Sequence, residues 1–186
     1  ALILSLLASQ KREPLAPGVL TEIERALASA RQLTDLSNDF LELEKFEAGR
    51  GSLESASISA LDVCELACET LAETIDSVGV VIEIPKKDCI IMADESRILK
   101  VMEVLLLNAI RRSTAGASIV ISLNTADGFA TLGITDYGPP IADTDADVIF
   151  DKFSLSSETG AGRSGLGLAI AKAIVAAHDG TIGGIS

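Results

Sequence analysis

The residues best suited to chemistry lie near the end of the chain, in a glycine-rich run from Gly160 to Leu168. Backbone amides that no side chain covers, placed where a helix begins, can hydrogen-bond phosphate oxygens. Gly160, Gly162 and Gly165 also spell the dinucleotide pattern GxGxxG. That pattern requires a strand before it and a second strand–helix unit after it, and the polar stretch before the run and the few residues after it supply neither. The run therefore indicates phosphate binding outside a Rossmann fold. The sequence contains no GxxxxGK[ST] motif, so the run is not a P-loop either.

An asparagine in apolar surroundings is the second candidate group. Asn108 lies within the apolar run Leu105–Ile110. Burying its side-chain amide costs free energy unless the amide forms hydrogen bonds. Its oxygen is a neutral hard ligand that suits Mg²⁺, and Arg111, three residues later, can face the same phosphates. A buried Asn hydrogen-bonded to neighbouring backbone explains the same residue, so both interpretations stay open.

Two further stretches combine a fixed polar or aromatic group with a loop. Asp136 follows an apolar strand, and Gly138 lets a ligand approach the backbone closely. Such a fixed acceptor suits the exocyclic amino group of adenine, whereas an Asx-turn at a strand end is the alternative. Phe150 and Phe153, three residues apart, can anchor a loop, and packing into the core explains them equally well.

Composition excludes several classes of protein. Lys and Arg number 15 against 27 Asp and Glu, a formal net charge of −12, which argues against nucleic-acid binding. With 48% hydrophobic residues the chain can bury a core. No apolar run approaches the ~18 residues of a membrane span, and no secretory leader opens the chain. We therefore expect a cytoplasmic segment without direct membrane contact, whose parent protein can still be membrane-anchored. The three cysteines form no CxxC and are expected to be buried thiols.

The N-terminal part predicts a helical hairpin. Residues 1–9 are helical and apolar, Pro14 and Pro17 interrupt the chain, and a long helix follows from about Leu20 to Ala48. Its apolar residues recur every three or four positions and form one stripe. The stripe consists of Leu20, Ile23, Leu27, Ala30, Leu33, Leu36, Phe40, Leu43 and Phe46. Because one hairpin cannot bury such a stripe, two hairpins are expected to close a four-helix bundle in a homodimer.

The rest of the chain alternates helices and strands. Residues 1–49 are assigned to the hairpin, 50–59 to a linker and 60–186 to a second domain. In this domain we expect helices over 61–77, 94–112, 148–153 and 165–178, and strands over 80–84, 89–92, 118–124 and 129–135, with a final strand after Gly180. Ser59 and Asp94 are the expected helix caps, and Asp127-Gly128 the hairpin turn. The predicted fold class is α+β, an α/β sandwich whose mixed sheet is covered by helices on one face.

The order and spacing of the four stretches resemble the catalytic core of a sensor histidine kinase, that is, dimerisation helices followed by an ATP-binding domain of the gyrase/histidine-kinase type. Asn108 falls on the N box of that family, Asp136-x-Gly138 on the G1 box, Phe150-x-x-Phe153 on the F box and Gly165–Leu168 on the G2 box. The segments Leu43–Gly49 and Ala177–Ile182 also fit the family. The resemblance covers essentially the whole chain.

The resemblance implies ATP and Mg²⁺ as cofactors. Asn108 would coordinate the metal, Asp136 would receive the adenine amino group, and residues 154–164 would form a mobile lid from which Arg163 reaches the phosphates. The full ATP-binding set implied is Asn108, Arg111, Asp136, Gly138, Ile141, Lys152, Phe153, Arg163, Gly165, Leu166, Gly167 and Leu168.

The implied activity is that of an ATP-dependent protein-histidine kinase. It would pass the γ-phosphoryl group to a histidine on its own dimerisation helix, and from there to the aspartate of a response-regulator receiver domain. The receiver would dock on the hairpin, chiefly on the exposed face of residues 22–42.

Three features depart from the family pattern. Val104 stands where a second polar residue is usual, Pro140 replaces the second glycine of the G1 box, and the phosphoacceptor histidine is absent. The one histidine, His178, lies at a helix end and is expected to be structural. These departures leave an alternative, a dimeric docking or phosphotransfer module whose nucleotide site has degenerated. A further alternative is an ATP-driven clamp of the gyrase type. Such a clamp would need a general-base Glu at the position of Val104 and would lack the long helical hairpin, so both features argue against it.

Overall fold

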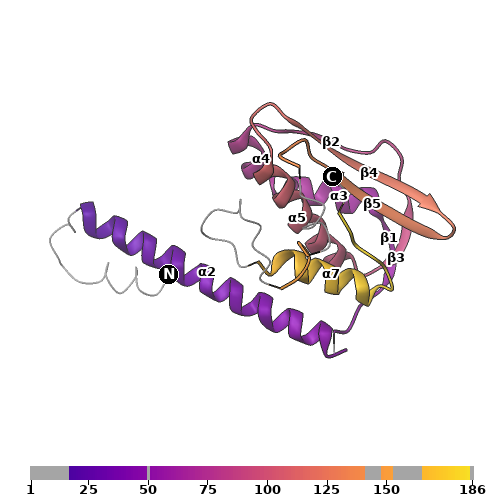
Figure 1. Cartoon of the computed structure of the whole chain (residues 1–186), viewed down its shortest axis with the longest axis horizontal. Helices are drawn as coiled ribbons and strands as arrows, with labels where there is room; N and C mark the ends of the chain where they lie inside the picture. The colour runs from indigo at the N-terminus through magenta and orange to yellow at the C-terminus, as the bar shows by residue number, and fades with distance from the viewer. Residues whose placement is uncertain (1–16, 50, 141–147, 153–164, 185–186) are drawn as a thin grey trace. The chain divides into compact units, whose positions relative to one another are not determined.

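The computed structural model describes residues 17–49, 51–140, 148–152 and 165–184 (Figure 1). The chain divides into two units after Asn38, and the last turns of helix α2 (Pro17–Glu47) belong to the second unit. Within the described ranges, no helix combines the length and the apolar character that a membrane span requires.

Helix α2 agrees with the long helix predicted from residue 20 to residue 48. In the part of α2 that belongs to the first unit, the side chains of the apolar stripe are not buried. The side chain of Leu33, for example, is 69% exposed. The helix predicted over residues 1–9 lies outside the described residues. The hairpin, and the dimer that depends on it, therefore remain predictions.

The described part of the second unit forms a two-stranded and a three-stranded sheet. Strand β1 (Ala56–Ser59) pairs antiparallel with β3 (Ile90–Ala93). In the other sheet β4 (Ser118–Ala126) is central, with β2 (Val81–Glu83) parallel on one side and β5 (Phe129–Thr135) antiparallel on the other. The β4–β5 turn places Asp127 and Gly128 at φ values of 52° and 82°, as the Asp-Gly pair predicts. This mixed sheet with its helices confirms the predicted fold class.

Among the described residues, the helices that accompany the sheets are α3 (Ala60–Thr70), α4 (Ala72–Val78), α5 (Glu95–Arg112) and α7 (Gly167–Ala177). The Ser59 side chain caps α3 by accepting a hydrogen bond from the Asp62 amide at 3.0 Å. Helix α5 packs between α3 and α7 (Figure 1). Its buried residues meet α3 and the inward-facing side chains of β4. This core includes Val63, Cys64, Ala67, Met102, Leu106, Ile110, Ile119 and Ile121.

Several predicted elements differ from the structure. The expected linker over 50–59 ends in strand β1, because β3 supplies a backbone partner that the local sequence does not reveal. The helix expected over 61–77 breaks at Leu71, whose φ and ψ of −98° and 9° leave the helical range. Residues 148–152 form turns rather than a helix, and residues 181–184 belong to no strand pairing. Among the described residues no strand pairs with 181–184 and no helical turn continues at 148–152, so both predictions were wrong there.

The cysteine thiols are free in the structure, as expected, but their burial differs. Cys64 is fully buried, whereas Cys68 and Cys89 are half-buried. Burial, reinforced by the neighbouring thiols, raises the pKa of Cys64 to about 11. Cys64 is therefore protonated at neutral pH and is not a nucleophile.

A buried carboxylate begins helix α5. The Asp94 side chain, 6% exposed, accepts hydrogen bonds from the backbone amides of Glu54 (2.9 Å) and Arg97 (3.2 Å) and from the Ser96 hydroxyl (2.8 Å). Burial alone would raise the pKa of this carboxyl, but the hydrogen bonds outweigh burial and hold the pKa below its ordinary value. Asp94 thus joins the segment before β1 to the helix that carries the site.

Replacing Asp94 with Ala is expected to lower the free energy of unfolding at pH 7 by about 1–3 kcal/mol, because the cap and two other donors lose their acceptor. The folded-state pKa lies below the unfolded value of about 3.9, so the carboxylate stabilises the fold above that pH. This contribution is lost as the pH falls through the folded-state pKa. The difference in urea unfolding between wild type and Asp94→Ala should therefore shrink on acidification; a constant difference from pH 7 to pH 3 would contradict this role.

Candidate functional site

One face of α5 carries a row of residues four positions apart, Val104, Asn108 and Arg112, which therefore lie along the same side of the helix. At one end of the row, a Cβ added to Gly167 would lie 3.4 Å from Val104 Cγ1. At the other end, a Cβ added to Gly138 would lie 2.6 Å from the Arg112 carbonyl oxygen. The start of α7 and the loop after β5 thus both contact this row, and half-buried Asn108 lies between the two contacts.

The loop after β5 is held by its own carboxylate and by the end of α5. Asp136 Oδ1 accepts a hydrogen bond from the Gly138 amide at 2.9 Å. Arg112 donates through Nη2 to the Pro139 carbonyl, and its Nε lies 3.5 Å from Asp136 Oδ1. The Asp136 and Arg112 side chains are 22% and 19% exposed, so water screens their ion pair less than one on an open surface. The result is a fixed acceptor, held against the end of α5.

The glycine-rich end of the site leads directly into α7. Gly165 has a φ of 65°, which glycine adopts without a Cβ penalty. Leu166 is fully buried and anchors the turn, and its carbonyl accepts from the Ile170 amide at 2.8 Å. No side-chain hydrogen bond from Leu166 caps the helix. The first amides of α7, at Gly167 and Leu168, are therefore of the kind that can bind an anion.

Lys152, predicted to contact the nucleotide, is engaged elsewhere in the structure. Its Nζ lies 2.6 Å from Glu47 Oε2 and 3.3 Å from Glu44 Oε1, near the end of α2. The hydrogen bond to Glu47, with a contribution from Glu44, raises the pKa of the Lys152 ammonium above its ordinary value. Phe150, two residues earlier, is 6% exposed, which agrees with core packing as the role of the first aromatic.

The last turns of α2 hold the first half of α5, a contact that the sequence did not reveal. Leu43 is fully buried, and Arg97 forms an ion pair with Glu42. The Arg97 guanidinium also lies 5.4 Å from the centre of the Phe46 ring. The apolar spacing of α2 predicted that Leu43 and Phe46 would be covered, but it assigned them to a helical bundle rather than to α5.

The remaining predicted residues divide into exposed and undescribed ones. Arg111 is exposed on α5. Ile141, Phe153 and Arg163 lie outside the described residues, as does the rest of the expected lid.

His178 has a structural position, as expected. Its Nε2 accepts a hydrogen bond from the Asp94 amide at 3.0 Å, and its Nδ1 lies 2.8 Å from the Ile174 carbonyl oxygen. These partners assign the proton to Nδ1, so both ring nitrogens are used within the fold. His178 therefore ties the end of α7 to the start of α5.

The described residues supply few ligands for a metal. They contain no group of three His, Cys, Asp or Glu side chains suited to hold an ion. Asn108 offers one amide oxygen, and Val104, packed beside Gly167, offers none. Since Mg²⁺ usually keeps several waters and binds largely through phosphate oxygens, Asn108 fits a metal that arrives with a phosphate ligand.

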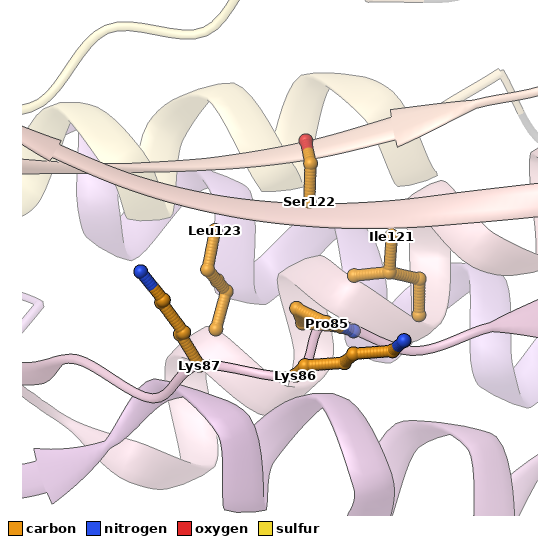
Figure 2. Close-up of a pocket in the computed structure, with 6 residues that line it drawn as sticks. All are labelled: Pro85, Lys86, Lys87, Ile121, Ser122 and Leu123. Atoms are coloured by element: carbon orange, nitrogen blue, oxygen red, sulfur yellow. The ribbon is translucent and has the colours of Figure 1, made fainter.

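A separate hollow lies between the loop after β2 and strand β4. It has a volume of about 380 Å³ and is lined by Pro85, Lys86, Lys87, Ile121, Ser122 and Leu123. Figure 2 shows the side chains of Ile121 and Leu123 pointing toward this loop and that of Ser122 pointing the opposite way. None of the predicted site residues lines the hollow, so it provides an independent location against which the candidate site can be tested.

Comparisons with known sequences indicate a family of ATPases. Residues 93–184 match the family of histidine kinase-, DNA gyrase B- and HSP90-like ATPases. The sensor protein SphS of Synechococcus elongatus is 30% identical over 193 residues, covering 95% of this chain and 46% of SphS. The histidine kinase BaeS of Escherichia coli is 30% identical over 159 residues, covering 83% and 34%. The chain therefore spans less than half the length of these two relatives.

Solved structures show the same fold. The Acinetobacter baumannii histidine kinase AdeS is 25% identical with a TM-score of 0.73, covering 94% of this chain and 80% of that one. Full-length ShkA in complex with AMPPNP is 23% identical (TM-score 0.77; 94% and 37% covered). ThkA in complex with the response regulator TrrA is 21% identical (TM-score 0.69; 98% and 52% covered). The last two likenesses concern the fold alone.

The family match of residues 93–184 and the likeness of fold assign this domain to the ATPase domains of the histidine kinase and gyrase type. With helix α2 before that domain, the chain is similar to the catalytic core of sensor histidine kinases.

Proposed function

We propose that this segment binds Mg·ATP on the face of α5 and is the kinase core of a two-component sensor. The observation that carries the proposal is the arrangement around Asn108. The loop of Asp136 and the first turn of α7 contact the same row of α5, one on each side of Asn108. A base at one end and phosphates at the other would span this row, which is about 12 Å long from Val104 to Arg112 at 1.5 Å per residue.

The Asp136 loop suits the base of the nucleotide. Its carboxylate is held by the Gly138 amide and by Arg112, so it needs no reorganisation to accept the adenine amino group. Because Gly138 has no Cβ, the loop can lie directly against the Arg112 carbonyl at the end of α5, which keeps the Asp136 carboxylate beside the row. In the same proposal the amides of Gly167 and Leu168 receive phosphate oxygens, and Arg111 adds a positive charge.

Phosphoryl transfer needs positioning and charge neutralisation more than covalent chemistry from the protein. When bound, Mg²⁺ would neutralise phosphate charge, with Asn108 as its protein ligand. A histidine nitrogen would form a bond to the γ-phosphorus as the bond to the bridging oxygen breaks, leaving ADP. Because both nitrogens of His178 are engaged, the acceptor is a histidine outside this segment.

Two partners complete the proposal. The open stripe of α2, exemplified by Leu33, supports a homodimer through the helical hairpin. A response-regulator receiver would then dock on the face of residues 22–42 and accept the phosphoryl group on its aspartate. The ThkA–TrrA complex supports such a partner by likeness of fold.

Titration of the wild-type segment with ATP, with and without Mg²⁺, tests the proposal. We expect micromolar to millimolar affinity, as measured by calorimetry, and tighter binding with the metal. Asn108→Ala should weaken Mg·ATP binding about tenfold and affect metal-free ATP less, because its amide oxygen acts through the metal. Equal losses with and without Mg²⁺ would contradict a ligand role for Asn108.

The alternative of a degenerate docking module is favoured by one observation, the apolar contact of Val104 with Gly167 inside the proposed site. The same titration separates the two functions. Complete absence of ATP binding by the folded segment would support the docking module and overturn the kinase core.

A further inference from the structure

Arg112 lies at the end of α5 and contacts the Asp136 loop at two points. Its Nη2 donates to the Pro139 carbonyl, and its Nε lies 3.5 Å from Asp136 Oδ1. The Nε atom is buried and has no hydrogen-bond partner, so its 3.5 Å contact with Oδ1 is an ion pair and not a hydrogen bond. Among the described residues it is the one buried side-chain nitrogen or oxygen without such a partner. The guanidinium therefore acts on the carboxylate through charge and fixes the backbone through Pro139.

These contacts make the two oxygens of Asp136 unequal. Oδ1 already accepts from the Gly138 amide and faces the positive charge of Arg112. Within the part of the chain that the structure describes, no hydrogen bond or ion pair engages Oδ2. The carboxylate thus presents one fully available oxygen to a ligand, although a free carboxylate can accept through both.

We propose that Arg112 is a positioning residue that makes the site selective for adenine over guanine. The proposal rests on nucleotide binding at Asp136, as proposed above. By holding Oδ1 beside its guanidinium, Arg112 leaves Asp136 with Oδ2 as its acceptor for the base.

The two purines differ in the donors that they present to such a group. Adenine offers its N6 amino group as a single donor next to the N1 acceptor, which matches one available oxygen. Guanine offers N1–H and the N2 amino group side by side and pairs best with both oxygens of a carboxylate. Because Oδ1 already accepts from the Gly138 amide and also faces the Arg112 guanidinium, the guanine donor directed at Oδ1 would lie beside a positive charge. A poorly paired buried polar group is costly.

Competition binding of ADP and GDP tests this role. Wild type should prefer ADP, and Arg112→Met should lower that preference about tenfold, the equivalent of one hydrogen bond to a charged group. Arg112→Lys keeps a positive charge near Asp136 and should retain most of the preference. Arg112→Gln introduces a neutral side chain that can still donate to Pro139, and it should lose the preference for ADP as Arg112→Met does. If the Met variant does not fold, the ADP-to-GDP preference is measured on the Gln variant.

Arg111→Met is the matched comparison on the same helix. Because Arg111 is assigned to the phosphates, its loss should weaken ADP and GDP by equal factors and leave their ratio unchanged. An unchanged ratio in folded Arg112→Met or Arg112→Gln, with nucleotide still bound, would overturn the role of Arg112 alone. Absence of nucleotide binding by wild type would instead overturn the proposed function together with this inference.

Discussion

Gly138→Ala is expected to lower the affinity for ATP by about 100-fold or more, equivalent to roughly 2.7 kcal/mol. The new Cβ would lie 2.6 Å from the Arg112 carbonyl oxygen and 2.8 Å from Asp136 Oδ1. Neither atom is the end of a long flexible side chain, so the loop has to move away from α5. That movement displaces the carboxylate proposed to receive adenine and should also lower the free energy of unfolding by about 1–3 kcal/mol.

Gly183→Ala provides the control, because a Cβ at Gly183 meets no atom within 4 Å and its φ is not positive. Its ATP affinity and its unfolding midpoint in urea should match those of wild type. Wild-type ATP affinity in Gly138→Ala would show that the Asp136 loop does not contact the nucleotide.

Asp136→Asn should cost about 30- to 100-fold in ATP affinity while changing stability by less than about 1 kcal/mol. The variant has the same shape, and its carbonyl oxygen can still accept from the Gly138 amide. Its NH₂ group would then take the place of Oδ2 and face the adenine amino group donor to donor. Calorimetric titration with ATP, alongside thermal unfolding, separates the loss of recognition from any loss of folding.

Asp127→Asn makes the same chemical change in the β4–β5 turn. Asp127 has a φ of 52°, which asparagine also adopts readily, and it lies outside the proposed site. We expect unchanged affinity for this variant. Equal ATP affinity in Asp136→Asn and Asp127→Asn would show that the Asp136 carboxylate does not take part in recognition of the base.

Those parts of the fold that depend on local chemistry could be predicted from the sequence. Asp94 and the apolar spacing that follows it define α5, and the Asp127-Gly128 pair defines the hairpin. Both signals act within a few residues along the chain. The same locality explains why Asp136 and Gly138 could be singled out before their surroundings were known.

Features that depend on residues far apart in sequence could not be predicted. Strand β1 forms because β3 lies beside it, although the serine-rich segment has a weak strand pattern. Lys152 meets Glu47 across 105 positions, and no local pattern records that ion pair. Its engagement by α2 places the predicted nucleotide contact of Lys152 in competition with Glu44 and Glu47.

Arg112 shows the same limit within the site. Its neighbour Arg111 was singled out because it follows Asn108 by three residues, yet Arg111 is exposed and Arg112 contacts the Asp136 loop. Helical spacing allowed both positions, since residues three and four apart share a face. The position of the loop after β5 makes Arg112 its partner, and the phosphate role of Arg111 stays a prediction.

Mapping ADP onto the folded segment by amide chemical shifts tests the central claim most directly. If the nucleotide lies along α5 between the Asp136 loop and α7, the largest changes should appear at Gly138, Gly167 and the side-chain amide of Asn108. Changes centred instead on Lys86, Lys87 and Leu123, around the separate hollow, would contradict it.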